Sequence, residues 1–194
     1  MRLVLIFLTL MISFLSHAEQ CLSTVSKNKE FINQPNNNKL TRIQEQSVNR
    51  LFQELSRSWI GTVSGFYCVG EEIGNTRKVY KAFDLELEFN NDVPLILRSR
   101  TKLDDKDEYT QRLSSLNIFA DQGYLRFDQN NQLGDIWIDK LSSTHLNVWY
   151  LSRAGTVYHL INREIKRSPG AFTINVKTYS NKRLTSVYTG RLSY

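Results

Sequence analysis

Hydrophobic and polar residues alternate along most of the chain between Trp59 and Tyr194. The clearest example runs from Val79 to Phe89, where Phe and Leu occupy every second position from Phe83 onward and Asp and Glu stand between them. Successive side chains of a β-strand point to opposite faces, so such a segment has one dry face and one wet face. The pattern predicts a long antiparallel sheet.

Turn-forming residues interrupt this alternation at intervals of roughly 8–15 residues, which favours pairing between strands that are neighbours in sequence. Gly61 and Gly65 predict bends or a close approach of two backbones, which a curled sheet needs. We therefore expect an all-β domain with an N-terminal helix, in which an antiparallel meander closes into a β-barrel of about 8–10 strands. The predicted strands are residues 59–68, 79–89, 95–103, 109–120, 124–127, 135–139, 145–151, 156–166, 172–179 and 183–193.

The domain is predicted to span residues 41–194 and to begin with a helix over residues 41–57. Thr41 followed by Gln44 suits a capping box, in which each side chain bonds the backbone of the other. One face of this helix is apolar, as expected if it packs on the side or the end of the sheet. A lid or a partner-binding helix is the alternative. The apolar stripe consists of Ile43, Val48, Leu51, Phe52 and Leu55.

The first 18 residues have the pattern of a cleaved secretory signal, with Arg2, an apolar run and small residues before Ala18. The apolar run is short for a membrane span, although an uncleaved anchor is the alternative. Residues 19–40 then form a polar arm. The sequence contains no Asn-x-Ser/Thr glycosylation site. We expect a periplasmic or secreted protein, with the bacterial periplasm favoured.

Cys21 and Cys68 are the two cysteines of the chain. An even pair in an exported protein is expected to form a disulfide, here between the polar arm and the end of the first strand. A metal pair or a reactive thiol is disfavoured, because no His or acidic residue lies near them at ligand spacing.

The charge balance limits the classes of partner that we expect. The formal net charge is +6, and the basic residues are spread along the chain and interleaved with acids. This is typical of a solvated surface and does not favour nucleic-acid binding. Membrane association is expected to be peripheral at most, through weak attraction to anionic lipids.

A helix that leads into a first strand opening on Trp59, followed by a meander with Arg191 in its last strand, resembles the lipocalin-like barrels. The resemblance implies that Trp59 plugs one end of the barrel and that Arg191 packs on its ring. The sequence departs from that family at Arg57, where the family has glycine two positions before the Trp. The order of elements is also similar to that of the periplasmic carriers that ferry lipoproteins to the outer membrane, whose barrel is unclosed.

No catalytic constellation stands out. His145 and His159 belong to no metal-binding motif, so we expect no metal and no cofactor. His159 could act with Arg163 or Glu164 as an acid/base or anion-binding group, or it could be satisfied by a neighbour across the sheet. The acidic residues of the turn 104–108 are expected to be solvated, with loose cation binding as an alternative. Enzymatic activity is left open.

Aromatic residues occur in nearly every predicted strand, and a barrel of about eight strands can hold one small ligand. The same rings could instead fill the core. We expect an exported, soluble binding protein or carrier for a small hydrophobic or lipid-like ligand. The alternatives are an outer-membrane barrel, which could be a lipid-modifying enzyme, and a protein-interaction module without a small ligand. The predicted inward, ligand-binding residues are Phe83, Leu85, Leu87, Trp137, Trp149, Tyr158, His159, Phe172 and Ile174.

Overall fold

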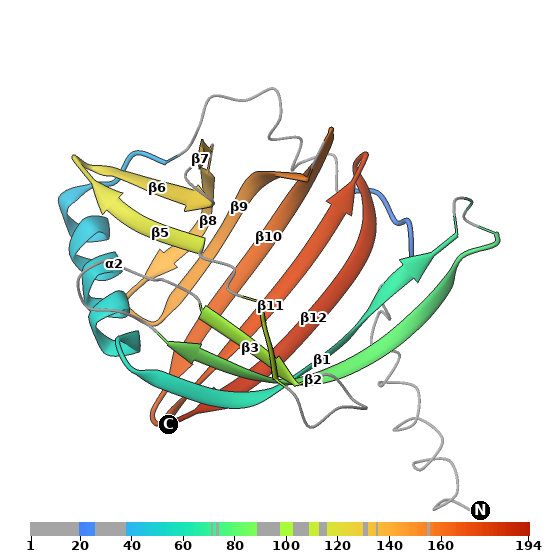
Figure 1. The fold of residues 1–194 in the computed structure, drawn as a ribbon. Helices are drawn as coiled ribbons and strands as arrows, with labels where there is room; N and C mark the ends of the chain where they lie inside the picture. Colours follow the sequence, from blue (N-terminus) through green and yellow to red (C-terminus); the bar gives the residue numbers. More distant parts are fainter. Residues whose placement is uncertain are drawn as a thin grey trace, which may run out of the picture.

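The computed structural model describes residues 20–25, 38–70, 72, 74–88, 98–102, 109–112, 116–129, 132–134, 136–154 and 156–194. Within this part of the chain lie one helix and twelve strands (Figure 1). Their bounds are α2 Arg42–Leu55, β1 Ser58–Val69, β2 Arg77–Glu88, β3 Arg98–Lys102, β4 Tyr109–Arg112, β5 Leu116–Asp121, β6 Tyr124–Gln129, β7 Gln132–Gly134, β8 Ile136–Ser142, β9 His145–Ala154, β10 Val157–Ser168, β11 Ala171–Ser180 and β12 Arg183–Ser193.

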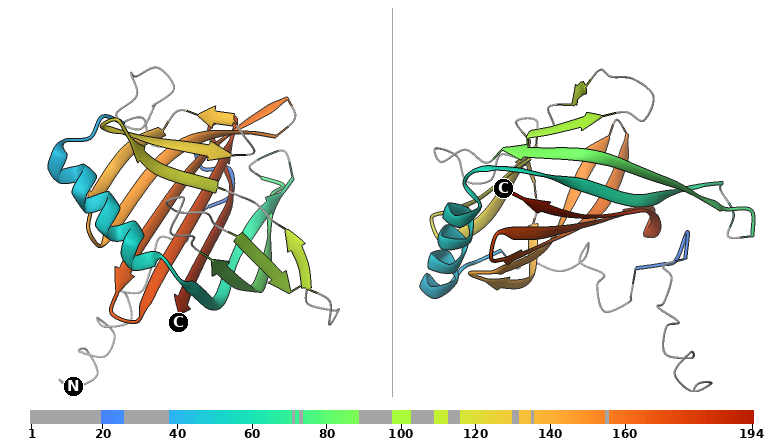
Figure 2. Two further views of the ribbon diagram at one scale, coloured as in Figure 1. Left: turned by 60° about the vertical axis from the view of Figure 1, so that its left-hand side comes forward. Right: turned by 90° about the horizontal axis from the view of Figure 1, so that it is seen from below.

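The strands form two antiparallel sheets. Nine of the described strands make one sheet in the order β4-β3-β2-β1-β12-β11-β10-β9-β8, and β5, β6 and β7 make the other. The first and last strands thus pair at the centre of the large sheet, and β4 and β8 are its edges in the described part of the chain. The sheet is strongly curved (Figures 1 and 2). The antiparallel meander is confirmed, whereas its closure into a barrel is not.

The predicted segment 109–120 is not a single strand. Residues 109–112 form β4 of the large sheet, and residues 116–121 form β5 of the small one. The short strand β7 was not predicted. A change of pairing partner leaves no mark on the alternation of side chains, because alternation is set by the local backbone. The start of the predicted strand 95–103 lies outside the described residues.

The core lies on the face of the sheet that packs against α2, which we call the inner face; the other is the outer face. Trp59, Val63 and Phe172 belong to it, together with Ile118 of β5 and Phe127 of β6. The small sheet and α2 lie on the concave side of the large sheet (Figures 1 and 2). One continuous core therefore joins the helix and both sheets.

The helix begins with the predicted capping box. Thr41 Oγ1 accepts a hydrogen bond from the Gln44 backbone N–H at 3.3 Å, and Gln44 Oε1 accepts one from the Thr41 N–H at 2.9 Å. Four of the five predicted stripe residues are buried, but Ile43 is 75% exposed. Its inclusion in the stripe is wrong: Ile43 lies five positions before Val48, and at about 100° per residue this offset places it about 140° away around the helix axis.

The polar arm is joined to the outer face. Cys21 and Cys68 form the predicted disulfide, with a Cα–Cα distance of 5.7 Å. The arm then follows the start of β12, where Leu22 N–H donates to the Leu184 carbonyl at 2.9 Å. Val25 packs against an outer-face cluster that contains Trp149. The arm thus covers apolar side chains that the outer face would otherwise expose.

Gly61 and Gly65 lie where β1 meets β12. A Cβ on Gly61 would stand 2.8 Å from Leu192 Cα, and one on Gly65 would stand 2.7 Å from Tyr188 Cα, both closer than Cβ atoms approach other atoms. The predicted close approach of two backbones is confirmed. Glycine is required here because the two central strands are packed against each other along their length.

Candidate functional site

The inner face is ordered in rows that run across the strands. Gly65 of β1 is paired with Lys81 of β2 on one side and with Tyr188 of β12 on the other. The same line continues from Tyr188 to Val176 and from Val176 to Arg163. We call this line the central row. It consists of Lys81, Gly65, Tyr188, Val176, Arg163, Val148 and Ile138.

The rows on the α2 side of the central row are apolar and dry. The adjacent row contains Val63, Ile174 and Ile165, all buried, with Phe83 half-buried at its end. The next contains Leu85, Leu192 and Phe172, also buried. This half of the inner face is the hydrophobic core, and its described cation, Arg167 beside Phe172, is already paired with Glu54 of α2.

The rows on the other side carry polar groups among apolar ones. Tyr67, Ser186 and Thr178 share a row with Ile161. Beyond them, His159 Nδ1 lies 2.7 Å from Ser180 Oγ. The inner face thus changes from apolar to mixed at the central row, and this boundary is our candidate site.

Two cations lie in the central row: Lys81 at its end is exposed, and Arg163 lies within it. The Arg163 side chain is half-buried between Val176 and Val148 on the neighbouring strands. Its Nε is buried without a hydrogen-bond partner, and no ion pair with a described carboxylate satisfies it. The Tyr150 ring lies 6.0 Å from its Cζ, at the outer limit of a cation–π contact. The guanidinium is therefore only weakly compensated by the described protein groups.

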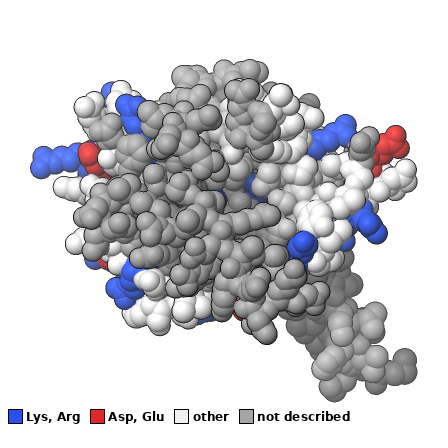
Figure 3. Space-filling view, viewed as in Figure 1, with Lys and Arg blue, Asp and Glu red and all other residues white. Residues whose placement is uncertain are grey.

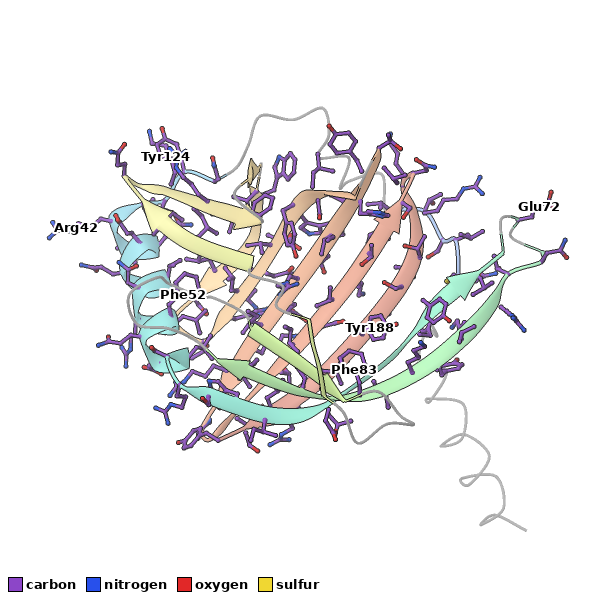
Figure 4. All side chains as sticks on the ribbon, viewed as in Figure 1. Arg42, Phe52, Glu72, Phe83, Tyr124 and Tyr188 are labelled. Atoms are coloured by element: carbon purple, nitrogen blue, oxygen red, sulfur yellow. A yellow bond between two sulfur atoms is a disulfide. The ribbon has the colours of Figure 1, made fainter. Side chains whose placement is uncertain are left out.

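Tyr188 lies two strands away in the same row. Its ring packs beside Phe83, with the centroids 5.8 Å apart (Figure 4), and occupies the space that the missing side chain of Gly65 leaves. Burial raises the pKa of the Tyr188 hydroxyl, and the neighbouring Tyr67 raises it further. The hydroxyl is thus a protonated donor in a partly dry setting.

The predicted inward residues divide between the two faces. Phe83, Leu85, His159, Phe172 and Ile174 lie on the inner face. Leu87 pairs with Trp59 in the backbone register, and its side chain lies outside the described part of the chain.

Trp137, Trp149 and Tyr158 lie on the outer face instead. Ile136 and Ile138 face inward next to Trp137, so that the Trp points the opposite way. Trp137 and Trp149 form the outer-face cluster with Leu160, and Tyr158 is exposed. The aromatic character of these residues did not predict which face of the sheet they lie on. Successive side chains of a strand point to opposite faces, so the position of a residue along the strand decides its face.

Trp59 lies at one end of the sheet and is buried, but Arg191 does not pack on it. Arg191 pairs with Thr62 on the outer face and is exposed. The cation near Trp59 is Arg57, whose Cζ lies 5.7 Å from the Trp ring centroid and 4.2 Å from that of Tyr194. Arg57, at the position where the lipocalin pattern has glycine, supplies the cation instead.

The outer face carries a polar cluster on β9 and β10. Glu164 Oε1 lies 2.9 Å from His145 Nε2 and 2.9 Å from Lys166 Nζ. Burial raises the pKa of Glu164, but hydrogen bonds and charges from Lys166 and His145 outweigh it and leave this pKa below its ordinary value. Glu164 therefore does not pair with His159, which lies on the inner face.

The described residues bring together no group of three His, Cys, Asp or Glu side chains that could hold a metal ion. The described helix is too short and too polar to cross a membrane. In the view of Figure 3, described Lys and Arg side chains lie mainly around the rim of the molecule.

Sequence reasoning considered Arg163 only as a partner of His159 and did not select Tyr188 or Tyr67. A usable signal was present in β10, where Ile161, Arg163 and Ile165 occupy alternate positions. A charged residue inside an apolar series on one strand face is a candidate for an interior polar site. The row that joins it to Tyr188 depends on pairing with β11 and β12, which the sequence does not display.

Comparison with known protein families, with curated proteins and with solved structures finds no match to this chain.

Proposed function

We propose that this protein is an exported, soluble carrier that binds a small hydrophobic or lipid-like ligand on the inner face of its curved sheet. The observation that carries the proposal is the boundary at the central row, where buried apolar rows meet rows with polar groups. An amphiphile has the same division, with an apolar tail and a polar head. Half-buried Phe83, Val176 and Ile161 lie at this boundary and would contact the ligand.

The polar residues of the outer face support the proposal that the protein is surrounded by water. The mid-strand positions of this face carry Thr62, Asp84, Thr189 and Asn175 on four adjacent strands. A barrel embedded in lipid needs an apolar band on that face, and charged side chains there are costly. The outer-membrane alternative is therefore disfavoured.

Export is supported by the disulfide between Cys21 and Cys68. Disulfides persist in oxidising compartments and are rare in the cytosol. A periplasmic or secreted location is part of the proposal, and the apolar N-terminal run provides the route.

The proposal is tested by delipidating the purified, disulfide-bonded protein and adding single amphiphiles. Native mass spectrometry should show one bound molecule, and the melting temperature should rise with ligand concentration, because a ligand that binds only the folded state stabilises it. No bound species and no rise across carboxylate, phosphate and neutral lipids would contradict the proposal.

A matched pair of variants locates the site. Val176→Gln places an amide on the inner face, and Val187→Gln places the same group on the outer face of the adjacent strand. Losing a valine contact should weaken binding roughly tenfold in Val176→Gln, whereas Val187→Gln should bind as the unaltered protein does. Equal loss in both variants would place the ligand elsewhere.

A further inference from the structure

We infer that the ligand is an anionic amphiphile whose head group binds Arg163. This inference rests on the proposed function and names the chemistry of its ligand. The shared chemistry is a carboxylate or phosphate oxygen attached to an apolar tail.

The first argument is a contrast between two arginines of β10. Arg163 and Arg167 are four residues apart and lie on the same face of the strand. Arg167 forms an ion pair with Glu54 of α2 through its Nη1, and Arg50 also contacts Glu54 at 3.2 Å. Arg167, the arginine nearer α2, therefore has a carboxylate partner within the protein.

Arg163 has no such partner among the described side chains. The described carboxylates of the large sheet, Asp84, Asp139 and Glu164, lie on the outer face. Partial burial of a charge is costly unless a counter-charge or hydrogen bonds compensate it. An anionic head group would supply the missing carboxylate or phosphate oxygen.

The second argument is the chemistry around the guanidinium. Arginine presents a planar set of N–H donors that suits a carboxylate or phosphate, and such charge-assisted bonds are strong when partly shielded from water. Tyr188 lies in the same row two strands away, about 10 Å along the sheet. Its ring leans away from Arg163, over Gly65 and against Phe83. The donor that the site offers to a head group is therefore the Arg163 guanidinium.

The third argument is the apolar surface on either side of the central row. Phe83 packs against Tyr188, and Ile161 lies beside Arg163 on the same face of β10. These apolar groups are half-buried and suit a hydrocarbon tail. A free inorganic anion would use only the Arg163 guanidinium, so the arrangement favours an amphiphile over a simple ion.

The test compares three probes that share an oleoyl chain: oleate, oleoyl lysophosphatidate and the uncharged monoolein. Each is titrated into the delipidated, disulfide-bonded protein at constant ionic strength. We expect the preferred anion to bind at least about tenfold more tightly than monoolein, as a charge-assisted hydrogen bond requires. The ratio of the two anions distinguishes a carboxylate from a phosphate head group.

Arg163→Gln should abolish the preference for the anion while leaving monoolein binding within about twofold. Arg191→Gln removes the same charge from the exposed outer face and should keep the preference. Circular dichroism and melting temperature check that each variant is folded, and Arg163→Met, which also removes the charge and keeps an unbranched side chain, replaces the Gln variant if that one fails to fold.

The outcomes separate the two proposals. Binding of monoolein as tight as that of both anions, or an undiminished preference in Arg163→Gln, would overturn the head-group inference and leave the carrier function standing. An undiminished preference in Arg163→Met would overturn the inference in the same way. Failure of all three probes to bind would overturn the carrier function itself.

Discussion

The indole Nε1 of Trp59 donates a hydrogen bond of 2.9 Å to the backbone carbonyl of Leu55. Leu55 is the last residue of α2 and Trp59 is the second residue of β1, so this bond fixes the turn between them. The Trp ring also packs edge-on against Phe172 and Tyr194, with centroid distances of 4.9 and 5.0 Å. Helix, first strand and chain end thus meet at one buried side chain.

Trp59→Phe should destabilise the protein by about 1–3 kcal/mol, because it leaves the Leu55 carbonyl without its partner in a dry site. Trp59→Ala should cost about 3–5 kcal/mol through the cavity that it creates. Urea unfolding followed by circular dichroism measures both. A Phe variant as stable as the unaltered protein would show that the hydrogen bond contributes nothing.

Alanine at Gly61 or Gly65 should cost about 1–3 kcal/mol or more, because the added methyl group meets the backbone of β12. Gly74→Ala is the matched control, since nothing lies within 4 Å of its Cβ position. Thermal unfolding of the three variants gives the comparison. Equal melting temperatures for all three would mean that β1 and β12 are not packed so closely.

Replacing both cysteines by serine should lower the free energy of unfolding by about 4 kcal/mol, the loop-closure value for the 47-residue separation. The double variant avoids leaving one free thiol. The polar arm should also loosen from the outer-face cluster, which Trp fluorescence would report through Trp149. A thiol titration that finds two free thiols in protein taken from its own compartment would contradict the disulfide and weaken the case for export.

Glu164→Gln should reduce stability at pH 7 and have little effect at strongly acidic pH. The pKa of Glu164 is lowered in the folded protein from 4.5, so its ionised form stabilises the fold. That contribution is present above pH 4.5 and is lost as the pH falls through the lower folded value. Denaturant unfolding from pH 7 to pH 2 measures the difference from the unaltered protein.

Glu72→Gln is the control for that experiment, because it removes the same charge from an exposed turn and should have little effect at any pH. A stability loss in Glu164→Gln that is constant across the pH range would mean that His145 and Lys166 do not favour the ionised carboxylate.

The sequence by itself determined the local elements. The capping box at Thr41, the strand that became β2 and the last three strands could all be identified from residues a few positions apart, because helix caps and strand alternation are short-range effects. The disulfide could be predicted because the chain has two cysteines and an N-terminal pattern typical of exported proteins. The same short range limited the prediction at 109–120, where two strands join different sheets without a break in the pattern.

Only the tertiary structure decided which face is concave, how far the sheet closes, and which side chains meet across it. Trp137 and Trp149 face outward because register fixes the face of every residue in a strand, and register is set by pairing along the whole sheet. The central row arises in the same way. Arg163 and Tyr188 are 25 residues apart in the chain, and they share this row because β10 pairs with β11 and β11 pairs with β12. Such contacts depend on long-range packing, which no local pattern encodes.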